Sequence, residues 1–181
     1  GRLVTGTPML VLRPGSVKDI VKMVRYARDN GLTIAMNGQS GTDDEFESHS
    51  NFGQALVPGG IAIDARGLRT IHTVDNRCAD VDAGVTWSEL DAAASAIGRT
   101  PPMLTDFVHL SIGGTLSVGG TGGTMQKVGA QVDTVQSLTV VTGEGKQVEC
   151  SPNSKADLFN AALAGAGQCA VIVRARVALT A

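Results

Sequence analysis

The sequence predicts a small α+β protein, and three observations lead to that fold class. Strand and helix patterns alternate over the first third of the chain, a hairpin and a long strand lie near its end, and 23 glycines cluster between these elements. With 181 residues, 43% of them hydrophobic, the chain has the size of one domain and can bury a core. Because only 3% of the residues are aromatic, we expect glycine-rich backbone to shape any binding surface.

The first 36 residues show the clearest succession of elements. Residues 9–12 read as a short apolar strand, and Ser16 with Asp19 three positions later is typical of the start of a helix. Apolar residues then recur at helical spacing until Gly31, which suits a helix C-terminus. Residues 32–36 read as a buried strand. The segment is therefore predicted to form a strand–helix–strand unit.

A long loop is predicted at residues 37–60. It begins with Asn37-Gly38-Gln39-Ser40-Gly41, continues with an acidic stretch over residues 42–47, and ends with Pro58-Gly59-Gly60. Loops of this length inside compact domains are usually either functional or disordered. We therefore expect either a ligand-binding segment or a mobile insertion.

Further elements are predicted along the rest of the chain. Thr86 and Glu89 match a capping box at the start of a helix that would end at Gly98. Residues 101–129 show neither helical nor strand periodicity, so we expect a loop there. The remaining predicted elements are strands at residues 61–63, 79–85 and 170–179, a hairpin of residues 135–141 and 146–150, and a short helix at residues 154–163.

Composition argues against several classes of function. The net charge of −2 and the pI of about 5.9 provide no broad attraction to nucleic acid or to an anionic membrane. The sequence has no run of about 18 apolar residues and no signal-peptide pattern at its start, so we expect a soluble protein, cytoplasmic or secreted. The spacing of Cys78, Cys150 and Cys169 fits neither a disulfide framework nor a zinc site. We predict three buried thiols and no metal site.

The glycine clusters admit two interpretations. Glycine loops that follow strands can gather backbone N–H groups around a phosphate without any charged side chain, so they would suit a diphosphate cofactor. They could equally form tight turns between short strands. The sequence has no G-x-G-x-x-G after its first strand and no phosphate-binding P-loop motif, which argues against both of those nucleotide sites. The clusters are Gly113-Gly114, Gly119-Gly120 and Gly122-Gly123.

The order of several segments is more specific than any one motif. They are TDFVHLSIGGTLS at residues 105–117, LTVVTGEG at 138–145, ADLF at 156–159, and GAGQ with the later RAR at 165–176. In this order they resemble cytokinin dehydrogenases, and the resemblance spans nearly the whole chain. It implies the PCMH-type FAD-binding domain of the vanillyl-alcohol-oxidase family, with two small α/β subdomains around FAD. We place these at residues 1–65, with a loop insertion at 41–48, and at residues 66–181.

The resemblance also raises the question of a covalent flavin, because these enzymes attach FAD to the histidine of a G-H-S segment. Aligning forward from the strand that ends at Met36 puts Gln39-Ser40 at that place, and FAD would then be non-covalent. Aligning backward from Pro58-Gly59-Gly60 puts His49 there, and the acidic stretch becomes an insertion. We favour His49 as the attachment point. The remaining alternative is a solvated histidine on an acidic loop.

Other site residues are implied by the same resemblance. Asp106 matches the aspartate that accepts a proton from the substrate amine while the flavin takes a hydride, although an aspartate here could also serve as a turn residue. Ser111 and Ser117 could likewise make ordinary loop hydrogen bonds. The implied FAD contacts are Ser50, Gln54, Ser111, Ser117, Thr121 and Ile172, together with Asn37, Gly38, Gln39 and Ser40 at the start of the long loop.

The resemblance finally implies a function and a missing partner domain. A substrate-binding cap domain follows the strand at residues 170–179 in such enzymes, so a small-molecule substrate would be recognised outside this sequence. We expect an FAD-dependent oxidoreductase that oxidises a small amine or alcohol, with this part inactive alone. The alternatives are a degenerate nucleotide-binding module and the FAD domain of another oxidase, such as a sugar or alditol oxidase.

Overall fold

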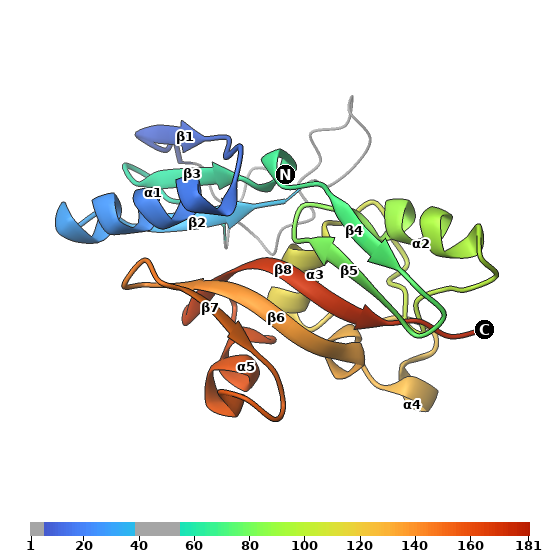
Figure 1. The fold of residues 1–181 in the computed structure, drawn as a ribbon. Coiled ribbons are helices and arrows are strands. Elements are labelled where there is room, and N and C mark those ends of the chain that lie inside the picture. Colours follow the sequence, from blue (N-terminus) through green and yellow to red (C-terminus); the bar gives the residue numbers. More distant parts are fainter. Residues whose placement is uncertain (1–5, 39–54) are drawn as a thin grey trace.

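Two β-sheets organise the computed structural model, which describes residues 6–38 and 55–181. Within that part of the chain, the first sheet is parallel, in the order β1-β3-β2. The second sheet is antiparallel, in the order β4-β5-β8-β6-β7, and lies beside the first (Figure 1). The strands are β1 (Leu10–Leu12), β2 (Ile34–Asn37), β3 (Ile61–Asp64), β4 (Ile71–Val74), β5 (Cys78–Asp82), β6 (Val135–Thr142), β7 (Gln147–Cys150) and β8 (Ala170–Ala178).

The predicted strand–helix–strand unit is confirmed as β1, α1 (Val17–Asp29) and β2, although β3 lies between the two strands. Ser16 is the N-cap of α1, and its hydroxyl donates to the Asp19 carboxylate at 3.0 Å. The helix ends where Gly31 adopts a φ of 64° and the next N–H, that of Leu32, bonds the Ala27 carbonyl. The chain therefore turns from α1 directly into β2.

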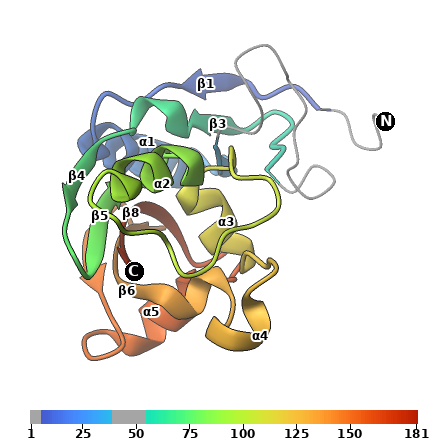
Figure 2. The ribbon, with the colours of Figure 1, turned by 90° about the vertical axis from the view of Figure 1, so that its right-hand side faces the viewer.

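Three helices cover one face of the second sheet: α2 (Trp87–Ser95), α3 (Ile112–Val118) and α5 (Ala156–Ala162) (Figures 1 and 2). Their apolar residues, including Trp87, Leu116 and Phe159, form one buried cluster with β5, β6 and β8. The indole N–H of Trp87 donates to the Thr115 hydroxyl at 2.7 Å, so its polar atom is satisfied inside the core. This contact also ties α2 to α3.

A β-bulge lets β8 contribute side chains to two hydrophobic clusters. Thr139 of β6 lies opposite Arg174 while the next residue, Val140, lies opposite Ile172, so Val173 is an extra residue in β8. Ile172 packs with the helices, whereas Val173 packs with Ile20 of α1 in a second cluster. Strand β8 belongs to the second sheet but contributes side chains to both hydrophobic clusters.

The sequence prediction is wrong for one segment and misses one strand. Residues 101–129 are not all loop, because they contain α3 and the short α4 (Met125–Val128). Two glycines give α3 a poor intrinsic helix propensity, and burial of Ile112 and Leu116 stabilises it instead. The strand β4 was not predicted. By contrast, the Thr86–Glu89 capping box and the β6–β7 hairpin are both confirmed.

The predicted boundary between residues 65 and 66 falls in the 3-10 helix η2 (Ala65–Gly67), after the last strand of the first sheet and before β4. The division into two subdomains stays a prediction. A second 3-10 helix, η3 (Gln131–Thr134), precedes β6. Cys78 and Cys150 are buried as predicted, but Cys169 is exposed because it lies in the turn before β8. No helix of the described residues is long and apolar enough to cross a membrane.

Alanine should destabilise one of the two adjacent glycine positions of α3 and leave the other nearly unchanged. A Cβ at the buried Gly113 would lie 2.6 Å from the Ala83 Cβ, whereas one at the exposed Gly114 would meet only the Ser111 hydroxyl, at 2.8 Å. We expect Gly113→Ala to lower the free energy of unfolding by roughly 1–3 kcal/mol through overpacking. Gly114→Ala should be near neutral, because the hydroxyl can rotate and helix propensity improves by up to about 1 kcal/mol. Urea unfolding of both variants checks this, and equal stabilities would contradict it.

The ion pair between β5 and β8 should make stability depend on pH. Both nitrogens of the Arg174 fork bond the Asp80 carboxylate, at 2.5 and 2.6 Å, and these bonds lower the pKa of Asp80 against the opposing effect of burial. The stabilisation is therefore present above the pKa of an unfolded aspartate and is lost as the pH falls through the lowered pKa of Asp80. We expect Asp80→Asn to cost about 1 kcal/mol or less at neutral pH, since the pair is partly exposed. Urea unfolding should show that the difference in free energy of unfolding between Asp80→Asn and the unaltered protein disappears in acid. A difference that persists in acid would argue against the ion pair as its source.

Candidate functional site

A cavity of about 820 Å³ lies between the two sheets. That volume suits a large organic ligand. One wall comes from the first sheet and its connections, and the other comes from α3 and the second sheet. The lining includes residues 33–38 at β2, residues 55–57, residues 113–115 of α3, residues 141–143 at the end of β6, and residues 166–172 leading into β8.

The structure brings together on this cavity every predicted cofactor-binding residue that it describes. These are Asn37, Gly38, Ser111, Ser117, Thr121 and Ile172. Their role as cofactor contacts stays a prediction. The other predicted cofactor residues, Gln39, Ser40, His49, Ser50 and Gln54, lie outside the described residues. The choice between the Gln39 and His49 alignments is therefore open.

The two walls meet where β2 ends. The Asn37 side-chain amide donates to the Ala55 carbonyl at 3.0 Å, which joins both ends of the long connection to one edge of the cavity. Directly beyond it, Gly38 faces Ser111, the N-cap of α3. A Cβ at Gly38 would lie 1.7 Å from the Ser111 hydroxyl oxygen, so a residue without a side chain is required for this approach.

Backbone hydrogen bonds hold α3 against the neighbouring segments. The N–H groups of Ile112 and Gly113 donate to the carbonyls of Val85 and Ala83, both at 2.8 Å. At the other end of the helix, the Ala166 N–H donates to the Ser117 carbonyl at 2.8 Å, which fixes the turn that leads into β8. The helix and the glycine-rich turn thus form one continuous, ordered wall of the cavity.

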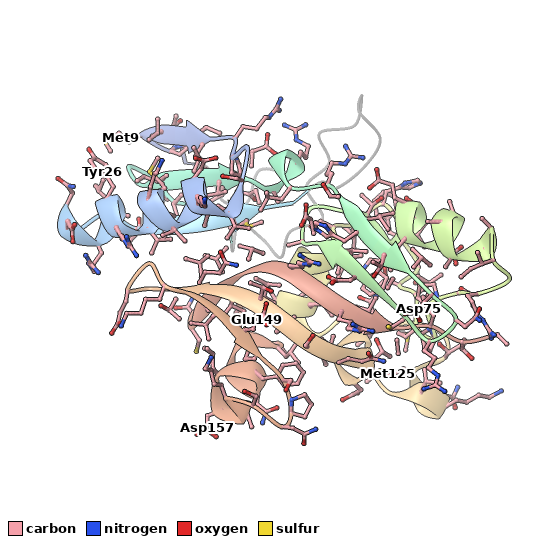
Figure 3. The ribbon with its side chains drawn as sticks, in the orientation of Figure 1. Met9, Tyr26, Asp75, Met125, Glu149 and Asp157 are labelled. Carbon is pink, nitrogen blue, oxygen red and sulfur yellow. The ribbon has the colours of Figure 1, made fainter. Side chains whose placement is uncertain are left out.

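No aspartate, glutamate, lysine, arginine or histidine is among the described residues that line the cavity. Its polar groups are serine and threonine hydroxyls, the side-chain amides of Asn37 and Gln168, and the backbone. Charged side chains lie elsewhere: Asp75, Glu149 and Asp157 are exposed on the outside of the second sheet and its helices (Figure 3). On the described part of the lining, backbone N–H groups and side-chain dipoles are the groups that could hold an anionic ligand.

Thr142 is a lining residue that the sequence prediction missed. It lies at the end of β6, and its Oγ1 is buried without a hydrogen-bond partner in the described part of the chain. Buried hydroxyls in proteins are normally paired, so this oxygen is an exception among the described residues. Its Thr-Gly sequence signalled only a hairpin turn. Thr105, Thr115, Gln168 and Cys169 also line the cavity without having been predicted to do so.

Asp106, the predicted catalytic residue, is exposed and does not line the cavity. Its neighbour Thr105 does, and the Thr105 hydroxyl donates to the Phe107 carbonyl at 2.9 Å, which fixes the backbone on both sides of Asp106. The carboxylate therefore sits on an ordered segment beside the cavity. Its proposed chemistry stays a prediction. Two histidines that do not line the cavity have polar neighbours elsewhere: His72 Nε2 lies 2.8 Å from Asp82 Oδ1, and His109 Nδ1 lies 3.1 Å from Ser88 Oγ.

Comparison with known proteins gives a consistent picture. A family model described as an FAD binding domain matches residues 8–151. An uncharacterized oxidoreductase of the fasciation locus of Rhodococcoides fascians is 41% identical over 181 residues, which are 100% of this chain and 40% of that protein. Cytokinin dehydrogenase 4 of Arabidopsis thaliana is 35% identical over 99% of this chain and 36% of its own length. Cytokinin dehydrogenase 8 of Oryza sativa subsp. indica is 37% identical over 99% of the chain and 35% of its own length.

The chain thus spans about two fifths or less of the length of these relatives. The family match covers most of the chain, and the two-sheet α+β fold agrees with it. The chain belongs to the family of PCMH-type FAD-binding domains, the family to which those of the cytokinin dehydrogenases also belong.

Proposed function

We propose that this chain is the cofactor domain of an oxidoreductase that oxidises a small amine or alcohol by hydride transfer to FAD. The observation that carries the proposal is the glycine-rich cavity between the two sheets, whose described lining carries no charged side chain and onto which the described cofactor-binding candidates converge. The cavity volume and the many backbone and hydroxyl groups on its described lining suit a long cofactor with a diphosphate at its centre.

The residues that would hold FAD fall into two groups. The hydroxyls of Ser111, Ser117 and Thr121 and the backbone of the glycine-rich segments would bind its polar parts. Apolar side chains such as Ile172 would pack against its rings. When bound, FAD supplies the two-electron acceptor that the amino acid side chains lack. The fixed backbone around α3 means that these groups are in place before the cofactor arrives.

Asp106 would accept a proton from the substrate. A carboxylate can accept the proton that leaves the substrate nitrogen or oxygen, provided it lies within hydrogen-bond reach of that atom. The segment that carries Asp106 borders the cavity through Thr105, so a substrate bound at that rim would meet both the carboxylate and the cofactor site. Substrate recognition would come from a separate cap domain.

The mode of FAD attachment can be tested by acid precipitation of the purified protein. We expect the flavin absorbance near 370 and 450 nm, typical of flavins, to stay with the precipitate, because His49 forms a covalent bond. In His49→Ala the native protein should remain yellow and release its flavin in acid. Release from the unaltered protein would favour the Gln39 alignment. A colourless protein that does not bind added FAD would reject the flavin domain and favour the degenerate nucleotide-binding module.

Asp106→Asn should leave FAD bound and slow the reduction of the flavin by substrate. Loss of a positioned base typically costs a factor of roughly 10²–10⁴ in rate. Stopped-flow absorbance of the full-length protein that contains this domain measures that rate. Asp157→Asn is the matched control, because Asp157 is an exposed carboxylate on α5, away from the cavity (Figure 3). Unchanged reduction kinetics in Asp106→Asn would remove this residue from the proposed chemistry.

A further inference from the structure

The connection between α2 and α3 carries Asp106 and is bound to the first turn of α2. The Trp87 N–H donates to the Leu110 carbonyl at 3.1 Å, and the Ser88 N–H donates to the Val108 carbonyl at 2.8 Å. The first N–H groups of a helix have no partner inside the helix, so the connection supplies their acceptors. In Figure 2 this connection faces the viewer. The start of α2 therefore fixes the backbone that follows Asp106.

A network of side-chain hydrogen bonds links the same helix start to His109. The Thr86 hydroxyl lies 2.9 Å from Glu89 Oε2 and 3.0 Å from the Ser88 hydroxyl. The Ser88 hydroxyl lies in turn 3.1 Å from His109 Nδ1. At the other end of the network, the Glu89 carboxylate pairs with Arg69. Side chains from α2 and from the connection are thus joined without a break.

The carboxylate in this network determines the direction of its hydrogen bonds. Burial raises the pKa of Glu89, but hydrogen bonds from the Thr86 N–H, from Arg69 and from the Thr86 hydroxyl outweigh that effect and lower the pKa. The carboxylate is therefore ionised at neutral pH and only accepts hydrogen bonds. The Thr86 hydroxyl then donates to Glu89 and accepts from the Ser88 hydroxyl. The Ser88 oxygen is left to accept, and its donor is the Nδ1–H of His109.

Contacts within the connection extend this order to both neighbours of Asp106. The His109 ring packs edge-on against the Phe107 ring, with the ring centroids 5.5 Å apart. On the other side, the Thr105 hydroxyl donates to the Phe107 carbonyl. The Asp106 carboxylate itself is exposed and has no hydrogen-bond partner among the described residues. Its direction therefore depends on the backbone that these contacts hold.

Under the proposed function, on which this inference rests, Asp106 accepts a proton at the rim of the cavity, and a base must lie within hydrogen-bond reach of its proton. We propose that Ser88 and His109 position Asp106 for this step, because their hydrogen bond holds the segment of residues 105–110 against the start of α2. Neither side chain lines the cavity, so both act through Asp106 and not on the substrate.

Four substitutions separate this hydrogen bond from the other contacts. Ser88→Ala removes the acceptor. His109→Leu removes the donor, whereas His109→Asn has nearly the same shape as His109→Leu and keeps an N–H near the place of Nδ1. Ser95→Ala is the matched control, because Ser95 is an exposed serine at the other end of α2.

Hydrogen exchange of backbone amides in the full-length protein shows whether the network orders the connection. We expect Ser88→Ala and His109→Leu to speed exchange within residues 105–110 by roughly tenfold, the value of one hydrogen bond. His109→Asn and Ser95→Ala should exchange there almost as slowly as the unaltered protein. Unchanged exchange in Ser88→Ala and His109→Leu would overturn the inference, because the network would then not hold the segment.

A double-mutant cycle shows whether this order acts through Asp106. Stopped-flow absorbance measures flavin reduction by the most reactive compound of a panel of primary and secondary amines and alcohols. Ser88→Ala should keep FAD bound and slow reduction by roughly tenfold, less than the roughly hundredfold that a misplacement of about 1 Å can cost. His109→Asn should retain most of the rate. In the Asp106→Asn background Ser88→Ala should cause no further loss, because the residue that it positions no longer acts as a base.

The possible failures of the inference and of the proposed function give different results. An unchanged rate in Ser88→Ala, or the same loss in the Asp106→Asn background, overturns the positioning role and leaves the proposed function intact. If Asp106→Asn alone reduces its flavin at the unaltered rate, or if no compound of the panel reduces the unaltered enzyme, the proposed function fails and the positioning role fails with it.

Discussion

The cavity depends on three consecutive residues, 83–85, whose backbone groups form hydrogen bonds with β8, with the segment after the first sheet and with α3. The Ala83 N–H donates to the Val173 carbonyl of β8, and the Gly84 N–H donates to the Leu68 carbonyl, just after the first sheet. The carbonyls of Ala83 and Val85 then accept the N–H groups that begin α3. A Cβ at Gly84 would lie 2.0 Å from the Ala65 carbonyl oxygen, so these hydrogen bonds can form only because residue 84 has no side chain. Close backbone approaches of this kind explain part of the high glycine content of the chain.

This arrangement explains how a protein with an almost neutral balance of charge can present a site for an anionic cofactor. Charged groups pair with one another away from the cavity, as Arg174 and Asp80 do between β8 and β5. At the end of β3, burial raises the pKa of the Asp64 carboxyl, but hydrogen bonds from Arg66 and Arg13 outweigh that effect and hold the pKa at about 2. Inside the cavity, the described lining offers only dipoles. Fixed dipoles need no reorganisation when a ligand binds, so less binding free energy is lost in ordering the site.

The sequence correctly predicts elements that depend on contacts between near neighbours. It does not predict elements that depend on tertiary packing. The Thr86–Glu89 box and the turn at Gly31 are contacts between near neighbours, so their residue types reveal them. The helix α3 has two glycines and no helical periodicity, and it forms because Trp87, Leu116 and the carbonyls of residues 83 and 85 hold it. Ser111 and Ser117, two of the cavity residues predicted in advance, lie inside the run of residues 105–117 that resembles cytokinin dehydrogenases. Thr142 lies in such a run, but its lack of a hydrogen-bond partner emerges only from three-dimensional packing.

The bulge in β8 links this packing to the cavity. Without the extra residue, Val173 and Arg174 would alternate across the sheet, and one of them would have to leave its present environment. With it, Val173 reaches the α1 core, Ile172 stays with the helices beneath the cavity, and Arg174 remains beside Asp80. Both clusters thus draw residues from a single continuous strand. Val173 of β8 and Val141 of β6 join Ile20 of α1 in one buried cluster. Strand register and this packing therefore position the two walls, and no charged pair of the described lining residues bridges them.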